Sequence, residues 1–151
     1  MSILNDVKSH IENSKNVDKK MPVAIFDIDG TLLDDSNGLK EYYEPNREIV
    51  QIAQQCRKHG LRNIVLTARP LESRLASRIN LQMHGIPYDK IITNDKNEAP
   101  TYKRKIRKEL AEQYHVVLAV GDKVHDYDGS GPETMKIRVE KGIAFKIGQY
   151  S

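Results

Sequence analysis

The chain has 151 residues, of which 38% are hydrophobic and 30% are charged, with a formal net charge of +3 and one cysteine. This length suits one domain that buries roughly two thirds of the surface of its unfolded chain. No apolar run approaches the ~20 residues of a membrane span. The small positive charge permits an anionic partner without identifying one. One cysteine excludes an internal disulfide, and the polar stretch from Met1 to Lys20 does not resemble a signal peptide, so we expect a cytoplasmic protein.

The first twenty residues read as an extension ahead of the main domain. Apolar residues recur at helical spacing from Ile3 to Ile11, and a polar, charged stretch follows them. We therefore predict an N-terminal helical extension and linker at residues 1–20 and a single domain at residues 21–151. The helix is expected to pack on the edge of the domain or to fray rather than to bind a partner.

Two acidic residues follow the first predicted strand of the domain. The run from Val23 to Phe26 is apolar and rich in β-branched and aromatic residues, which indicates a buried strand, and a Gly-Thr turn ends it. Side chains two residues apart on an extended chain point the same way. Asp27 and Asp29 can therefore converge beyond the carboxyl end of the strand, where open parallel sheets bind ligands.

A bound metal would explain this pair of acids. Burying two unpaired carboxylates would cost roughly several kcal/mol, and Mg²⁺ removes that cost because it binds carboxylates, keeps water ligands and accepts a substrate phosphate. One Asp could then act as a nucleophile, since Asp forms aspartyl-phosphate intermediates. A plain turn is the alternative, whereas a calcium loop would place Ile25 and Ser36 at positions that require acids.

Two helices, each with one apolar face, are predicted in the middle of the chain. The first begins at Pro45 and ends at Gly60, and Cys56 lies on its apolar face, so we expect this thiol in the core and not in a catalytic cleft. The second follows Pro70 and ends at Gly85, and its apolar face consists of Leu71, Leu75, Ile79 and Met83.

The strand between these helices, residues 63–66, leads into Thr67, Ala68 and Arg69. A hydroxyl, backbone N–H groups and a helix dipole at this place favour a bound phosphate, although Thr67 taken alone would more often be a helix cap. Arg69 could contact the substrate, lie exposed or form a structural ion pair.

A basic helix is predicted at about residues 101–114, after a short strand at residues 90–92. A solvated surface is the default interpretation, and a nucleic-acid surface is a second one, although the basic run lacks the aromatic interleaving of a stacking platform. In a third, one lysine near the helix start reaches the aspartates and neutralises the charge that develops on a phosphoryl group. The helix carries Lys103, Arg104, Lys105, Arg107 and Lys108.

A further buried strand is predicted at residues 116–120, and two more acids follow it. Gly121 lets the chain turn closely, and Asp122 and Asp126 emerge at the same carboxyl edge as the first pair. We therefore expect four acids from two strands to converge. Residues 143–147 are predicted to form a last strand, at the edge of the sheet.

The segment 27–31, Asp-Ile-Asp-Gly-Thr, resembles motif I of the haloacid dehalogenase-like (HAD) phosphatases. The resemblance implies that Asp27 attacks phosphorus and that Asp29 is the general acid and base, with a backbone carbonyl that binds Mg²⁺. Gly-Asp at 121–122 with Asp126 resembles motif IV, which completes an implied set of metal-site residues: Asp27, Asp29, Asp122 and Asp126.

Motifs II and III supply the residues that hold the phosphoryl group in this family. The segment 66–70, Leu-Thr-Ala-Arg-Pro, resembles motif II of members without a cap domain, and the helix from Tyr102 resembles motif III of the subfamily IIIB acid phosphatases. Lys105 is the alternative to Lys103 as the motif III lysine. The resemblance implies phosphoryl binding by Thr67, Ala68, Arg69 and Lys103.

The four motifs together imply a capless, Rossmann-like α/β domain with a parallel sheet of about five strands between helix layers. The implied reaction is Mg²⁺-dependent hydrolysis of a phosphomonoester, possible substrates including a nucleotide or a nucleic-acid end. A nucleic-acid 3′-phosphatase like the phosphatase domain of polynucleotide kinases is one alternative. A non-catalytic phosphate-binding or scaffold protein is another.

Overall fold

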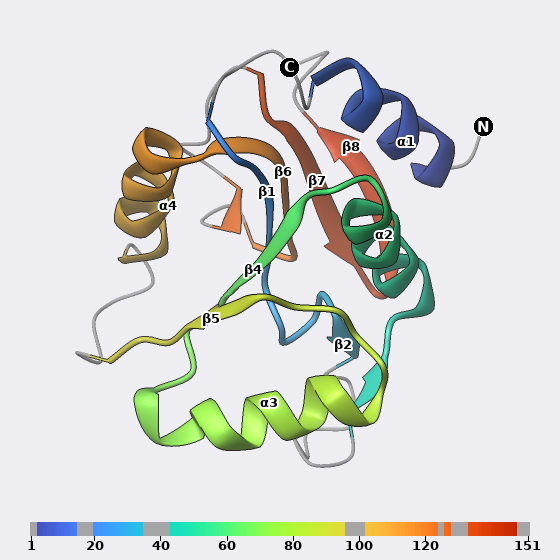
Figure 1. Cartoon of the computed structure of the whole chain (residues 1–151). Helices are drawn as coiled ribbons and strands as arrows, with labels where there is room; N and C mark the ends of the chain where they lie inside the picture. Colours follow the sequence, from blue (N-terminus) through green and yellow to red (C-terminus); the bar gives the residue numbers. More distant parts are fainter. Residues whose placement is uncertain are drawn as a thin grey trace.

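The protein is built around one mostly parallel sheet (Figure 1). The computed structural model describes residues 3–14, 20–34, 43–95, 102–123, 126–127 and 133–147, so the linker predicted before residue 21 lies largely outside the described residues. Six strands form the sheet in the order β5-β4-β1-β6-β7-β8, and only β8 runs antiparallel to its neighbour. The strands are β1 (Pro22–Phe26), β4 (Arg62–Leu66), β5 (Lys90–Ile92), β6 (His115–Gly121), β7 (Met135–Glu140) and β8 (Ile143–Ile147), with β2 (Leu33–Asp34) and β3 (Glu44–Pro45) pairing separately.

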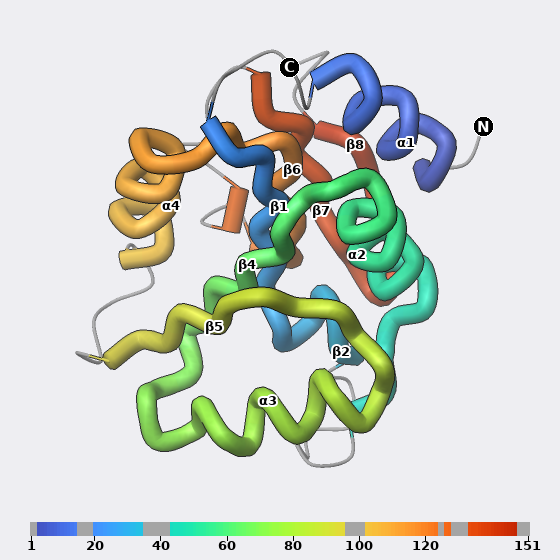
Figure 2. The backbone as a smooth tube through the Cα atoms, in the orientation of Figure 1, coloured from blue at the N-terminus to red at the C-terminus, as the bar shows by residue number. Residues whose placement is uncertain are grey.

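Helices cover both faces of the sheet, with α1 and α2 on one side and α4 on the other (Figure 1). A large hydrophobic cluster lies under α1 and α2, and a smaller one lies between α4 and the strands β1, β4 and β6. Figure 2 follows the backbone from α3 into the edge strand β5. The helices are α1 (Ile3–Ser14), α2 (Arg47–Lys58), the 3-10 turn η2 (Leu71–Ser73), α3 (Arg74–Met83) and α4 (Tyr102–Gln113).

The predicted α/β architecture with a parallel sheet is confirmed, with one more strand than expected. The additional strand is β7, whose buried and outward residues alternate from Met135 to Glu140. The helix expected from Pro45 begins instead at Arg47, because Pro45 pairs with Leu33 in the small β2–β3 sheet. Cys56 is fully buried in the core, as predicted.

The N-terminal helix packs against the domain. Val7 and Ile11 on α1 are fully buried in the larger hydrophobic cluster. His10 Nε2 donates a hydrogen bond to the carbonyl of Val117 in β6 at 3.0 Å, and burial lowers the pKa of His10 from 6.5. No helix of the described segments is long and apolar enough to cross a membrane.

The helix after Pro70 turns its apolar stripe away from the core. Leu71, Leu75, Ile79 and Met83 are all exposed, whereas the buried residues of α3 include the polar Ser77 and Asn80. These two polar side chains accept hydrogen bonds from the buried guanidinium of Arg69. A buried arginine needs hydrogen-bond partners, so the polar side of the helix faces inward.

Candidate active site

The ends of three neighbouring strands bring the predicted site residues to one edge of the sheet. Strand β1 lies between β4 and β6 and pairs in parallel with both. The residues that follow these strands are therefore neighbours in space: Asp27 after β1, Thr67 after β4, and Asp122 after β6. This is the carboxyl edge at which the sequence predicted a ligand site.

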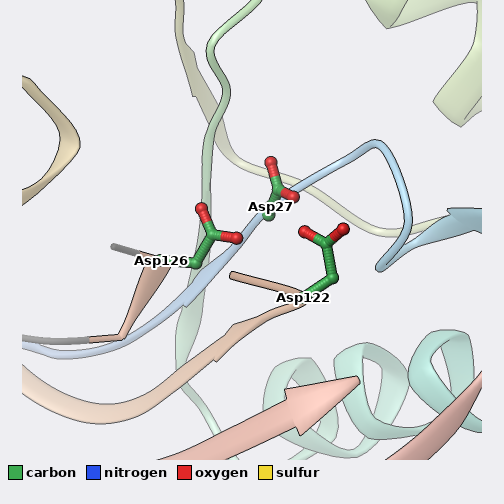
Figure 3. Close-up of side chains that lie close together, drawn as sticks. All are labelled: Asp27, Asp122 and Asp126. Atoms are coloured by element: carbon green, nitrogen blue, oxygen red, sulfur yellow. The ribbon is translucent and has the colours of Figure 1, made fainter. Parts of the chain in front are cut away.

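Three carboxylates meet at this edge. Asp27, Asp122 and Asp126 each offer an oxygen within 4.8 Å of the others' oxygens, and their carboxyl groups face a common space in Figure 3. Asp27 and Asp126 are buried, and Asp122 is partly exposed. The sequence predicted convergence of four acids, but the Asp29 side chain is not in this cluster.

Glycines allow the acids to approach so closely. A Cβ on Gly30 would meet the Asp122 carboxyl, with the Cγ atom at 2.9 Å, and Gly30 also has a φ of +78° that other residues rarely adopt. A Cβ on Gly121 would overlap the side chain of Asp126, reaching its Cγ at 2.6 Å. Both glycines are therefore required for the geometry of the acidic cluster.

Lys103 on α4 is inserted between two of the acids. Its Nζ donates hydrogen bonds to Asp27 Oδ1 at 2.7 Å and to Asp126 Oδ1 at 2.5 Å, and it is only 2% exposed. Burial alone would lower the pKa of Lys103, but Asp27 and Asp126 outweigh it, so that the pKa is raised. Lys105, the alternative lysine, is exposed and lines a different cavity beside β5.

One lysine does not balance the charge of three acids. Burial raises the pKa of Asp27 well above its usual value, and nearby Asp126 raises it further while Lys103 opposes both effects. Burial also raises the pKa of Asp122. Ligands that offer only oxygen suit a hard divalent cation, and such a cation would favour the ionised acids. The residues present therefore fit a divalent metal.

Asp29 is held outside the acidic cluster by Arg69. The guanidinium donates to both carboxylate oxygens, from Nε to Oδ2 at 2.9 Å and from Nη2 to Oδ1 at 2.5 Å. Arg69 is 4% exposed, and its Nη1 donates to Ser77 Oγ at 3.0 Å and to Asn80 Oδ1 at 3.4 Å. Of the arrangements left open by the sequence, the ion pair is the one seen.

Thr67 is buried beside this ion pair with its hydroxyl already oriented. Its Oγ1 accepts a hydrogen bond from the backbone N–H of Arg69 at 3.1 Å, so its own O–H remains a donor. The Tyr102 hydroxyl donates to the Thr67 carbonyl, and burial raises the pKa of Tyr102 to about 12. Ala68, the residue between Thr67 and Arg69, is exposed at this edge.

Sequence reasoning missed three residues that support the site. Ser77 and Asn80 hold Arg69, and Tyr102 holds the loop at Thr67. The polar pair three residues apart within an apolar helix was a usable signal, because such residues lie on one face of a helix. Nothing local in the sequence pairs Tyr102 with Thr67.

Comparisons with known proteins agree with this architecture. The family model described as HAD superfamily, subfamily IIIB (acid phosphatase) matches residues 39–145, a span that begins after Asp27 and Asp29. A search of curated protein sequences gives no match.

Solved structures share the fold at low sequence identity. The class C acid phosphatase from Bacillus anthracis superposes with a TM-score of 0.72 at 19% identity, over 83% of this chain and 62% of that one. A structure of the same enzyme with tungstate bound gives 0.67 at 19% identity, over 83% and 64%. A chain of the Pnkp1/Rnl/Hen1 complex gives 0.67 at 19% identity, over 81% and 47%. This chain thus spans less than two thirds of each of these relatives.

Proposed function

The chain belongs to the HAD superfamily, subfamily IIIB, a family of acid phosphatases, and we propose that it is a Mg²⁺-dependent phosphomonoester hydrolase that works through an aspartyl-phosphate on Asp27. The observation that carries this proposal is the buried Asp27 carboxylate, which accepts a hydrogen bond from Lys103 and lies beside two further acids at the carboxyl edge of the sheet. A carboxylate so placed has a fixed direction of attack, and cations balance its charge.

In the first step, a carboxylate oxygen of Asp27 forms a bond to phosphorus as the bond to the leaving oxygen breaks. Oδ1 accepts the hydrogen bond from Lys103, so Oδ2, which accepts a longer hydrogen bond from Thr31 Oγ1 at 3.4 Å, is the oxygen we assign to the attack. The free O–H of Thr67 donates to the transferring phosphoryl group. Lys103 neutralises the charge that develops on it.

Asp29 moves the protons in both steps. It gives a proton to the leaving oxygen in the first step, and in the second it takes one from the water that attacks phosphorus and releases phosphate from Asp27. Arg69 fixes the direction of this carboxylate through two hydrogen bonds. To hold the proton, one oxygen of Asp29 must leave the guanidinium, while the other stays bound.

The metal site is formed by the same edge of the sheet. We assign Asp27, the Asp29 backbone carbonyl and Asp122 as ligands, with Asp126 supporting the site through its hydrogen bonds to Lys103 and to the backbone N–H of Lys123. When bound, Mg²⁺ supplies positive charge that stabilises the ionised acids and the phosphate oxygens. A non-catalytic phosphate-binding protein would not need both a buried nucleophile and a separately oriented second acid.

The test is the release of phosphate from an aryl phosphate with and without Mg²⁺. We expect release to require the metal and to be lost in Asp27→Asn. The control Asp6→Asn changes an acidic residue of α1, a helix that supplies no residue to the candidate site, and should keep the normal rate. Folding of each variant is checked by circular dichroism. Equal release from Asp27→Asn, or release that continues after chelation of divalent ions, would refute the proposal.

A further inference from the structure

The outer face of β7 and β8 is not covered by any helix of the described segments. The strand register places Lys136 opposite Ile147, Arg138 opposite Phe145 and Glu140 opposite Ile143, so these six side chains share one face. Phe145 is 48% exposed and Ile143 is 57% exposed. We call this the β7–β8 face.

The two faces of these strands differ sharply. Ile137, Val139 and Ala144 point to the other side and are buried in the cluster beneath α1 and α2. The cluster beneath α4 contains residues of β1, β4 and β6 but none of β7 or β8. The side chains of Phe145, Ile143 and Arg138 are therefore exposed together on this face.

This face adjoins the candidate active site. Arg138 pairs in register with Gly121, the residue before Asp122. With strands about 4.8 Å apart, Phe145 lies two strands from Gly121, or about 10 Å, and three strands from Asp27 at the end of β1, or about 14 Å. A cavity of about 440 Å³ lies beside both regions, because its lining includes Asp122 and Lys123 of the site and Arg138 and Glu140 of the β7–β8 face.

The charge along this path is mainly positive. Lys136 and Arg138 lie on the β7–β8 face, and the exposed Lys141 and Lys123 lie at the rim of the cavity. Glu140 is the acidic residue of the face, and Asp34 adds a second acid to the cavity. Apart from Asp122, which the proposed function assigns to the metal, the cavity is lined by three cations and two acids.

We propose that the β7–β8 face binds single-stranded nucleic acid whose terminal phosphate enters the active site. Aromatic rings and arginine planes stack on bases, while lysines contact the backbone phosphates. Because stacked nucleotides are about 3.4 Å apart, the distance of about 14 Å from Asp27 places the third or fourth nucleotide from the end over Phe145. This inference rests on the proposed phosphatase function and identifies the class of its substrate.

The test compares substrates of increasing length. Rates are measured for p-nitrophenyl phosphate and for thymidine oligonucleotides of one to five residues that carry a 3′- or a 5′-phosphate. We expect kcat/KM to rise up to the fourth nucleotide and then to level off. The oligonucleotide-to-aryl ratio of kcat/KM should fall at least fivefold in Phe145→Ala, in keeping with the loss of one stacked base, and in Arg138→Gln. The control Met83→Ala removes another exposed apolar side chain, on α3, and should keep the ratio.

A binding measurement that needs no catalysis tests this inference separately from the proposed phosphatase activity. Fluorescence anisotropy of a labelled five-residue oligonucleotide, measured without Mg²⁺ at several salt concentrations, should show weaker binding in Phe145→Ala and a smaller salt dependence in Arg138→Gln. Aryl phosphate hydrolysis with no length dependence and unchanged binding in both variants would overturn the inference alone. If the wild type is a dimer and Phe145→Ala is a monomer, the β7–β8 face binds a second copy of this chain and not a nucleic acid.

Discussion

Replacing Arg69 with lysine tests whether the acid/base carboxylate is held by this arginine. The guanidinium makes two charge-assisted hydrogen bonds to Asp29 and two more to Ser77 and Asn80. A lysine keeps the charge but reaches at most one oxygen of Asp29, and it leaves the acceptors on α3 without their donor. Charge-assisted bonds contribute about 1.5–3 kcal/mol each. The side chain of Asp29 is 28% exposed, so water compensates part of the loss.

We therefore expect Arg69→Lys to lower the free energy of unfolding by about 2 kcal/mol. Misdirection of Asp29 should lower kcat by about 100-fold with little change in KM, because a displacement near 1 Å costs this much in rate. The assays are urea unfolding and aryl phosphate kinetics. Arg74→Lys is the matched control, since its partners Thr93 and Asp95 lie outside the acidic cluster.

The outcome distinguishes two roles of Arg69. If the guanidinium contacts the substrate directly, KM should rise while the unfolding free energy changes little. If neither kcat nor stability changes relative to the Arg74→Lys control, the ion pair with Asp29 does not matter and the reasoning is wrong.

Three further predictions follow from the burial of charged and small residues. Lys103→Met leaves the buried Asp27 and Asp126 without the cation between them, so the unfolding free energy of the metal-free protein should fall by about 3 kcal/mol. Mg²⁺ should then raise its Tm more than that of the wild type, and equal shifts would contradict this. Gly121→Ala forces Asp126 to move and should cost about 1–3 kcal/mol of unfolding free energy and most of the activity. Gly60→Ala is the control: its φ of +87° strains the backbone, but it has open space around it, so this variant should lose stability and keep its activity in the same assay. Burial lowers the pKa of His10 in the folded protein. As the pH falls below 6.5, the unfolded chain therefore binds a proton more readily than the folded one, and the free energy of unfolding decreases. Urea unfolding at pH 7.5 and at pH 5 should show a smaller decrease for His10→Gln than for the wild type.

The carboxyl edge of the sheet was predictable because its signals are local. Short apolar runs followed by acids or a hydroxyl indicate where parallel strands end, and the ends of such strands meet at one edge. The prediction of Lys103 needed the family resemblance, since several cations on α4 could equally have faced Asp27. Strand β7 alternates apolar and polar residues from Met135 to Glu140, a usable signal that the sequence interpretation missed.

The place of Asp29 was not predictable from spacing. The two-residue periodicity of a strand puts Asp29 beside Asp27, but the chain leaves the strand after Phe26, and Arg69 then binds Asp29 away from the other acids. Arg69 also explains why the apolar stripe of the helix after Pro70 is exposed. Helical periodicity identifies an apolar face, but the face of α3 that points inward is the one that binds the buried Arg69. This orientation depends on contacts between distant parts of the chain, which helical periodicity does not report.

The central claim is that Asp27 carries the phosphoryl group during turnover. Protein mixed briefly with a ³²P-labelled phosphomonoester and Mg²⁺ is quenched in acid, and the label on the denatured chain is measured with and without hydroxylamine, which cleaves acyl phosphates. The account predicts label that hydroxylamine removes, located in the peptide containing Asp27 and missing in Asp27→Asn. Turnover without any label on the chain in rapid-quench samples, or label on another residue, would contradict it.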